Sequence, residues 1–408
     1  HQLYPNELGW HVERITNEID AIVLGMHARE DNPELLKAKE LNIKIFSYPE
    51  FIYEQSKLKT RVVIGGSHGK TTITSMILHV MNFYEKDVDY MVGAQLEGFD
   101  VMVKLTEEND FIVLEGDEYL SSPIDKRPKF HLYKPNIALI SGISWDHINV
   151  FPTYEIYKKQ FEIFVESIVE GGSITYNSDD FDTNEVVNNT NRSIRKFDYS
   201  MPDYSIRNGI TYLQTVEGEL PLEIFGRHNL SNLMGAKWIC QQMGVDEDDF
   251  YQAISCFKGA SNRLEKVYST KNSFIYKDFA HSPSKVQATV NAVKDQFDKH
   301  KIIACFELHT FSSLNSDFIH EYKDTLNNAD VAIVYFSKTT LESKKMDNIK
   351  LNDIVLAFNN ANLLVFNDSS KFKDYLNSMN YDNSVLLMMS SGNFGNINFS
   401  ELQELLLK

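Results

Sequence analysis

The stretch that decides the fold is Arg61-Val62-Val63-Ile64-Gly65-Gly66-Ser67-His68-Gly69-Lys70-Thr71-Thr72. It joins an apolar strand to a helix through a glycine-rich turn. Glycines allow a tight turn in which backbone N–H groups and the N-terminus of the next helix face an anion. Lys70 adds a positive charge there, and the Thr71 hydroxyl can bind Mg²⁺. The stretch therefore predicts a phosphate-binding loop made of Gly66, Ser67, His68, Gly69, Lys70, Thr71 and Thr72.

The residues around this loop decide between phosphate binding and a plain turn. The general P-loop pattern has glycine where this chain has Ile64, so the compact form from Gly66 to Thr72 depends on its context. An apolar stripe at helical spacing predicts a helix over residues 71–81, directly after the loop. A glycine turn that binds nothing is the alternative. The order of strand, loop, Lys-Thr pair and helix favours phosphate binding.

Composition narrows the class of protein. A chain of 408 residues with 43% hydrophobic residues can form two or three domains, each with a core. The formal charge of −17 and the lack of a basic block argue against nucleic-acid binding, so a small nucleotide is expected. Three scattered cysteines predict neither a disulfide framework nor a zinc site. No apolar run reaches the ~20 residues of a membrane span, which predicts a cytoplasmic protein.

The first part of the chain resembles the end of an α/β unit. We expect a strand at residues 21–24, a helix at 33–41 and a strand at 43–46. Nucleotide-binding units of this kind usually open with a strand and a glycine-rich turn, and none precedes Gly25. Either the fold lacks that turn or the supplied chain is truncated.

Two further strands deliver metal-binding side chains. A strand at 111–114 ends at Glu115, and a strand at 136–140 leads to Asp146 and His147. Ligands of parallel α/β sheets lie at the carboxyl ends of the strands. Carboxylate and imidazole groups near a triphosphate would suit Mg²⁺, with water and phosphate oxygens completing the coordination. For a single histidine, a structural hydrogen bond is the alternative, and its place beside Asp146 favours function.

Two asparagines precede the next predicted helix. Asn229 and Asn232 follow Gly226, and the helix carries an apolar stripe that begins at Leu233. These asparagines either cap the helix or reach the edge of a base, and the sequence alone favours capping.

A third unit is expected from Arg263 onward. Its predicted elements are strands at 273–279, 301–308, 331–336 and 384–390 and helices at 284–298 and 399–407. Alternation of strands and helices predicts a mostly parallel sheet that helices cover on both faces. Polar groups follow two of these strands: Asp278 and His281 the first, Glu307 and His309 the second.

Taken together, these motifs resemble the Mur ligase family, whose members build the peptide of bacterial cell-wall precursors with ATP. The likeness extends over nearly the whole chain. The motifs that carry it are Gly66-Ser67-His68-Gly69-Lys70-Thr71-Thr72, Glu115-Gly116-Asp117-Glu118, Asp146-His147, Gly226-Arg227-His228-Asn229-x-x-Asn232, Asn262-Arg263-Leu264-Glu265 and Asp278-Phe279-Ala280-His281-Ser282-Pro283.

The resemblance implies an α/β fold with the three-domain Mur ligase architecture. A partial, Rossmann-like N-terminal domain that binds a UDP-sugar would span residues 1–58. A central P-loop ATPase-like domain would span 59–262, and a Rossmann-like C-terminal domain for the amine substrate would span 263–408. By the same likeness, the front of the first domain is missing from the supplied chain.

The resemblance also implies a reaction. UDP-N-acetylmuramate would be phosphorylated by ATP to an acyl phosphate, and an amine would then displace phosphate to form an amide. Residues 25–35, 115–119, 125–130 and 389–395 resemble most the Mpl branch, which adds the tripeptide L-alanyl-γ-D-glutamyl-meso-diaminopimelate in peptidoglycan recycling. Addition of L-alanine to the same sugar nucleotide, in peptidoglycan biosynthesis, is the alternative.

The family's functional residues carry over to matching positions in this chain. Lys70, Glu115, His147 and Arg263 would be catalytic. Thr71 and Glu115 would hold one Mg²⁺ and His147 a second, while Lys70 holds phosphates and Arg263 stabilises the transferring group. The remaining contacts would be Asn229 and Asn232 to adenine, Asp278 to ribose, Asn32 to the UDP-sugar, and His281, Glu307 and His309 near the amine.

Two other classes of function fit parts of the pattern. One is a P-loop NTPase or kinase in which the third domain is regulatory. The other is a non-catalytic nucleotide-binding protein that senses wall precursors. The presence of Glu115 and His147 together with Lys70 favours an enzyme.

Overall fold

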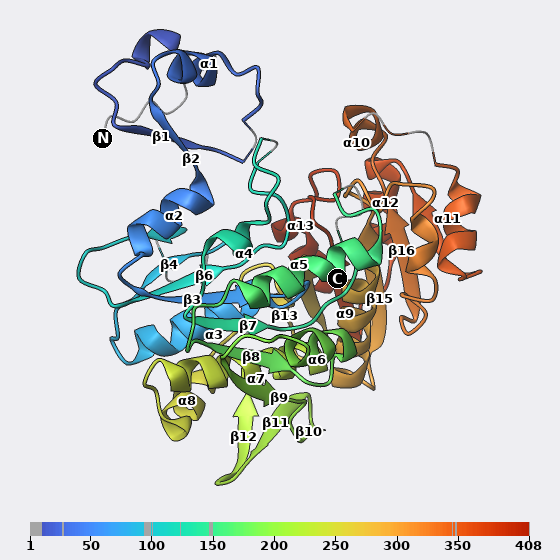
Figure 1. Cartoon of the computed structure of the whole chain (residues 1–408). Coiled ribbons are helices and arrows are strands. Elements are labelled where there is room, and N and C mark those ends of the chain that lie inside the picture. The colour runs from blue at the N-terminus through green and yellow to red at the C-terminus, as the bar shows by residue number, and fades with distance from the viewer. Residues whose placement is uncertain are drawn as a thin grey trace.

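The protein is described from a computed structural model. The structure describes residues 10–26, 28–93, 99, 101–122, 124–146, 150–344, 346 and 349–407. Its described strands form four sheets, and the three largest groups of elements follow one another along the chain (Figure 1).

The N-terminal unit is a small parallel sheet with short helices. It stands apart from the bulk of the molecule at the top of Figure 1, and α2 leads from it into the centre. Asn32 caps α1 by accepting hydrogen bonds from the N–H groups of Glu34 and Leu35, and Pro33 begins the helix. The elements are η1 (Val12–Arg14), β1 (Ala21–Leu24), α1 (Pro33–Glu40), β2 (Lys44–Ser47) and α2 (Tyr48–Ser56).

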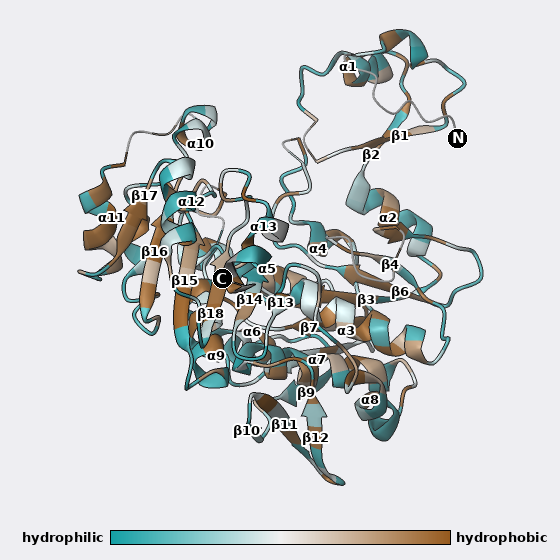
Figure 2. Cartoon of the chain, turned by 180° about the vertical axis from the view of Figure 1, so that it is seen from behind, coloured by the Kyte–Doolittle hydropathy of each residue, from teal (hydrophilic) through white to brown (hydrophobic). Residues whose placement is uncertain are grey.

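The central sheet is buried on both faces. Successive side chains of β3 point to opposite sides: Val62 and Ile64 pack against α3, α7 and α8, whereas Val63 packs against α4, α5 and α6. The strand order is β5-β4-β6-β3-β7-β8-β9, and all described pairs are parallel except β4 with β5. Such strands are continuously apolar, as the brown strands in Figure 2 show.

The bounds of the central elements follow. The strands are β3 (Thr60–Gly65), β4 (Asp89–Met91), β5 (Val103–Lys104), β6 (Phe111–Glu115), β7 (Ile137–Ile140), β8 (Ser173–Asn177) and β9 (Arg195–Tyr199). The helices are α3 (Lys70–Phe83), α4 (Lys129–Leu132), α5 (Tyr154–Glu166), α6 (Phe181–Asn188), α7 (Arg227–Gln242) and α8 (Glu247–Ile254).

A small antiparallel sheet projects from this domain, at the bottom of Figure 1. It consists of β10 (Tyr204–Arg207), β11 (Ile210–Thr215) and β12 (Gly218–Leu222). Its Thr211 hydroxyl donates a hydrogen bond of 2.9 Å to Gln296 on α9. The small sheet thus links the central unit to the third one.

The third unit is a second parallel sheet, with one antiparallel edge strand, in the order β13-β14-β18-β15-β16-β17. Its strands are β13 (Glu265–Ser269), β14 (Phe274–Asp278), β15 (Lys301–Glu307), β16 (Val331–Tyr335), β17 (Leu364–Phe366) and β18 (Ser384–Met389). Its helices are α9 (Pro283–Gln296), η2 (Ile319–Tyr322), α10 (Lys338–Ser343), α11 (Leu351–Phe358), α12 (Ser369–Ser378), α13 (Phe399–Gln403) and η3 (Glu404–Leu407).

Most predicted elements are confirmed within a few residues, including the helix after the phosphate loop and the mostly parallel third sheet. The capping prediction for Asn229 and Asn232 is wrong. Helix α7 begins at Arg227 after Gly226, so both asparagines lie inside the helix, and the Asn229 side chain donates to the Phe225 carbonyl at 2.9 Å. The predicted domain limits at residues 58 and 262 fall between sheets and stay predictions.

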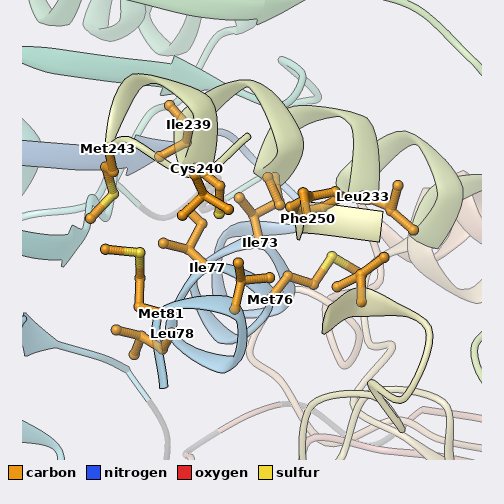
Figure 3. Packing of buried hydrophobic residues seen from close by; sticks show 14 of the residues in the cluster. Ile73, Met76, Ile77, Leu78, Met81, Leu233, Ile239, Cys240, Met243 and Phe250 are labelled. Carbon is orange, nitrogen blue, oxygen red and sulfur yellow. The ribbon is translucent and has the colours of Figure 1, made fainter. Parts of the chain in front are cut away.

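The packing of α3 against α7 predicts the effect of a core truncation. Leu233 is fully buried in the cluster of Figure 3, where it lies among side chains of both helices. We expect Leu233→Ala to lower the free energy of unfolding by about 2–5 kcal/mol, because the cavity it leaves cannot collapse fully. Urea unfolding monitored by circular dichroism measures this. Val216→Ala, at a fully exposed site, is the control, and equal losses in both variants would contradict the packing.

Candidate active site

A cavity of about 440 Å³ lies where the central sheet meets the third unit. The central unit contributes the phosphate loop, the end of β6, the loop after β7 and the start of α7. The third unit contributes Arg263, the end of β14 and the start of α9. The residues that line it are Ser67, His68, Gly69, Lys70, Thr71, Thr72, Gly93, Glu115, Asp117, Glu118, Tyr119, Asp146, His228, Asn229, Asn232, Arg263, Asp278, Phe279, Ala280, His281, Ser284, Lys285, Ala288 and Thr289.

The phosphate loop lies so close to its neighbours that two of its glycines are required. A Cβ on Gly66 would lie 2.0 Å from the Ser141 hydroxyl, and one on Gly69 would lie 2.2 Å from the Asn232 side-chain oxygen. Both glycines have positive φ, which side chains disfavour. The sharp turn and these close contacts direct the loop toward the N-terminus of α3, where an anion is favoured.

Lys70 is held at the bottom of this loop. Its ammonium donates to the Gly66 carbonyl and to Glu118 Oε2, each at 2.6 Å, and the Tyr157 hydroxyl donates to the other oxygen of Glu118. Burial lowers the pKa of Lys70, but the charges of Glu118 and Asp117 raise it by more, so Lys70 stays protonated. A phosphate entering the loop would compete with Glu118 for this charge.

Thr71 and Glu115 lie together across the paired ends of β3 and β6. The Thr71 hydroxyl donates to Glu115 Oε1 at 2.6 Å, and the Gly93 N–H donates to Oε2 at 2.8 Å. Burial and the charge of Asp117 raise the pKa of Glu115, whereas these hydrogen bonds lower it. A cation bound between the two side chains would therefore stabilise the charged carboxylate.

Arg263 reaches this group from the third unit. Its guanidinium lies 3.5 Å from the Thr71 hydroxyl and 4.5 Å from the centre of the Phe279 ring. Asp278 positions this segment, because its carboxylate accepts hydrogen bonds from the N–H groups of Leu264 and Ala280. Both predicted residues therefore line the cavity, and Asp278 has a structural task as well.

The start of α9 closes the cavity on the opposite side. The Ser284 hydroxyl lies 2.9 Å from His68 Nε2, and the Lys285 ammonium lies 3.5 Å from Asp146. Burial and the charge of Lys285 lower the pKa of His68 to about 3 and that of His281 to about 4, so both imidazoles are neutral near pH 7.

Some predicted residues are not brought to the cavity. Asn32 caps α1 in the N-terminal unit. Glu307 is the last residue of β15 and His309 follows shortly after it, and the Glu307 carboxylate accepts hydrogen bonds from the Ser390 hydroxyl and the Phe394 N–H. His147 lies outside the described residues.

The sequence prediction assigned no role to Glu118 and Lys285, two of the charged residues that line the cavity. Glu118 lies in the acidic stretch that supplied Glu115, and its spacing from Glu115 gave no sign that it would pair with Lys70. Lys285 lies two residues after Pro283, just beyond the quoted motif. Only the docking of α9 against the phosphate loop brings Lys285 and Asp146 together.

The donor set at Thr71 and Glu115 fits Mg²⁺ better than a transition metal. Among the described residues, no group of three or more His, Cys, Asp or Glu side chains could hold a metal. Mg²⁺ needs only one or two protein oxygens when phosphate and water supply the rest. The hydroxyl and carboxylate 2.6 Å apart meet that need.

The fold and the site are those of a P-loop-type nucleotide enzyme with an α/β domain closing over the loop. The family model for the Mur ligase middle domain matches residues 64–240. A curated relative from Caldicellulosiruptor bescii, named UDP-N-acetylmuramate–L-alanine ligase, is 32% identical over 321 residues, covering 75% of this chain and 68% of the relative. The chain therefore belongs to the Mur ligase family, whose members are ATP-dependent, ADP-forming amide ligases of peptidoglycan synthesis.

Two solved structures share the three-domain α/β fold. UDP-N-acetylmuramate-alanine ligase MurC from Thermotoga maritima has a TM-score of 0.71 at 17% identity, covering 98% of this chain and 87% of that one. The murein peptide ligase Mpl from Psychrobacter arcticus has a TM-score of 0.65 at 18% identity, covering 97% and 88%. The predicted fold class is confirmed, whereas a special closeness to Mpl is not.

No helix in the part of the chain that the structure describes is both long and apolar enough to cross a membrane.

The contact of Gly69 with Asn232 predicts a substitution that blocks the loop. In Gly69→Ala the methyl group would overlap the Asn232 side chain at a backbone φ of 78°. We expect ATP affinity to fall at least about tenfold, a loss of roughly 1.4 kcal/mol. Calorimetric titration with ATP measures it. Gly171→Ala, where φ is also positive but the space is open, is the control, and a Gly69 variant that binds ATP normally would contradict this geometry.

Because buried histidines are neutral in the folded protein, we expect the protein to lose stability in acid. Burial lowers the pKa of His228 from 6.5 to about 4, so the unfolded chain binds the proton more readily in that range. Stability is therefore complete above about pH 6.5 and declines toward pH 4, by up to about 1.4 kcal/mol per pH unit for each such histidine. His228→Gln should reduce this slope. Urea midpoints at pH 7, 6 and 5 measure it, and parallel curves for both proteins would contradict the prediction.

Proposed function

We propose that this chain joins the lactyl carboxylate of UDP-N-acetylmuramate to the amino group of L-alanine, with conversion of ATP to ADP and phosphate. The observation that carries the proposal is the cavity in which Lys70, the Thr71–Glu115 pair and Arg263 converge on the phosphate loop. The alanine-adding activity named for the relative that is 32% identical supports this acceptor. In the sequence prediction, L-alanine is the alternative acceptor and the tripeptide is the first.

The reaction would proceed in two balanced steps. A carboxylate oxygen attacks the γ-phosphorus, the bond to the bridging oxygen of ADP breaks, and an acyl phosphate forms. The amine then attacks the acyl carbon, loses a proton, and the C–O bond to phosphate breaks. Phosphoryl transfer of this kind requires positioning and neutralisation of charge more than covalent help from the protein.

The side chains of the cavity have separate tasks in these steps. Lys70 exchanges Glu118 for the β- and γ-phosphate oxygens, and Arg263 stabilises charge on the group in transfer. Thr71 and Glu115 would hold Mg²⁺, which would supply positive charge to the phosphates, and His147 is proposed for a second ion. We assign no general base, because the amine would reach the acyl carbon in its neutral form.

Other contacts follow from the position of each group. Asn229 and Asn232 on α7 are proposed to face adenine, and Asp278 to face the ribose while it holds Arg263 in place. Asn32 is proposed for the UDP-sugar, since it lies in the unit predicted to bind it. His281, which lines the cavity, is proposed to lie near the amine.

The tripeptide remains a second candidate acceptor because of one specific feature. The stretch 389–395, which resembles Mpl, lies against Glu307 and His309, the other residues proposed for the amine. A Cβ on Gly392 would lie 2.5 Å from His309 Nδ1 and 2.8 Å from Glu307 Oε2. The segment that resembles the tripeptide ligase thus shapes the proposed amine site.

Phosphate release in the presence of each acceptor tests the proposal. Purified protein is incubated with ATP, Mg²⁺ and UDP-N-acetylmuramate, and L-alanine or the tripeptide is added. We expect stimulation by L-alanine and mass-spectrometric detection of the amide, with loss of at least about 10²-fold in Lys70→Ala. If the tripeptide stimulates phosphate release and L-alanine does not, the tripeptide is the acceptor and the proposed one is wrong.

Controls in the same assay separate the other classes of function. Release of phosphate without any sugar nucleotide would indicate an NTPase or kinase. Binding of ATP without release under any condition would indicate a non-catalytic sensor. Circular dichroism of Lys70→Ala confirms that loss of turnover does not come from unfolding.

A further inference from the structure

Lys285 occupies a place where it does not help its own helix. It lies in the first turn of α9, two residues after Pro283, and the first turn is the positive end of the helix dipole. A cation at that end is unfavourable. On the same helix Lys294 lies in the last turn, where a cation is favoured. The position of Lys285 therefore needs a reason outside helix stability.

The surroundings of Lys285 supply that reason. Its side chain is 24% exposed and lines the cavity, with its ammonium 3.5 Å from Asp146 in the loop after β7. The preceding residue, Ser284, contacts His68 of the phosphate loop at 2.9 Å. The first turn of α9 thus touches two strand-end loops of the central unit and directs Lys285 into the space that they share.

Lys285 is the third cation in this space, beside Lys70 and Arg263. Burial lowers the pKa of Lys285 and the charges of Lys70 and Arg263 lower it further, whereas Asp146 and Glu118 raise it. Positive charges that converge in a partly buried cavity repel one another unless anions lie between them. In the structure Glu118 and Asp146 are these anions, and the oxygens of a triphosphate or an acyl phosphate would take their place beside the cations.

We propose that Lys285 is a further catalytic residue, whose ammonium contacts the γ-phosphoryl group while it passes from ATP to the carboxylate. The inference rests on the proposed function, since it concerns the same transfer. Lys285 forms no bond and gives up no proton: the bond from the γ-phosphorus to the ADP oxygen breaks, the bond to the carboxylate oxygen forms, and the charge of Lys285 stabilises the oxygens in between.

Lys285 would make phosphoryl transfer depend on docking of the third unit, which Lys70 cannot do. Lys70 belongs to the phosphate loop itself, whereas Lys285 arrives only when the third unit is docked on that loop through Ser284 and Asp146. Transfer would then be fast only in the docked arrangement, in which the amine-binding unit is also in place. Some other phosphoryl-transfer sites likewise receive a cationic residue from a separate element of the protein or from a partner.

The test compares two nucleotides that differ in the γ-phosphate. Affinities for ADP and for the non-hydrolysable β,γ-imido analogue of ATP are measured by calorimetry, with Mg²⁺ present, for the full chain and for Lys285→Met. We expect the methionine variant to bind the analogue roughly tenfold more weakly and ADP within about twofold of normal. Turnover should fall about 10²-fold. Lys294→Met, which removes a partly exposed lysine of the same helix that pairs with Asp330 just before β16, should change neither affinity.

The outcomes decide the proposal in either direction. Lys285→Arg keeps the charge and should keep most of the preference for the analogue over ADP. Equal weakening of both nucleotides in Lys285→Met, an unchanged preference, or an arginine variant that behaves like methionine would overturn it. If circular dichroism shows that Lys285→Met is unfolded, Lys285→Gln is used for the same comparison. The binding measurement uses no sugar nucleotide or amine, so its result is independent of which acceptor the enzyme uses.

Discussion

The parallel pairing of β3 with β6 and β7 is the constraint on which the rest of the structure depends. It brings the phosphate loop, Glu115 and the loop that carries Asp146 to one edge of the central sheet. The register sets Ile64 opposite Glu115, two residues before the loop begins at Gly66, so the Thr71 hydroxyl can reach that carboxylate. A shift of one residue would turn Glu115 to the other face of the sheet. The pairing of the strands therefore determines where the residues of the site lie.

A second sheet completes the site from outside. Strand β14 ends at Asp278, whose carboxylate holds the backbone at Leu264 and Ala280 and so positions Arg263 on one side and α9 on the other. The central unit provides the anion-binding loop, and the third unit provides cations that the loop does not contain. A site divided in this way is complete only when the two units are docked. Docking and chemistry are thus coupled by geometry.

The sequence predicted those parts of the fold and site that are local. The strand, glycine turn and helix at residues 60–83 follow from periodicity and glycine placement, and the structure agrees within two residues. The end of a strand predicts a ligand position at Glu115, and in the structure Glu115 lines the cavity. The capping of α7 was predicted wrongly because Gly226, with its positive φ, begins the helix earlier than the apolar stripe indicates.

Contacts between distant segments could not be predicted in the same way. The pairing of Lys70 with Glu118 joins residues 48 positions apart, and that of Ser284 with His68 joins residues 216 apart. Neither has a periodic signal, because the first depends on the pairing of β3 with β6 and the second on how the third unit docks on the central one. The same limit explains why Asn32, Glu307 and His309 were assigned by family likeness alone, and why the structure places them outside the cavity.

The balance of charge inside the cavity explains how these contacts could serve a reaction. In the structure, Lys70 is paired with Glu118 and Lys285 with Asp146. A buried pair is costly to break unless a new partner replaces the lost one. In the proposed reaction, an incoming triphosphate would offer such a partner to each cation, and Mg²⁺ would offer one to Glu115. Nucleotide would then compensate Lys70 and Lys285 for their lost partners, and Mg²⁺ would compensate Glu115, so this balance of charge favours entry of the two as a complex over separate entry.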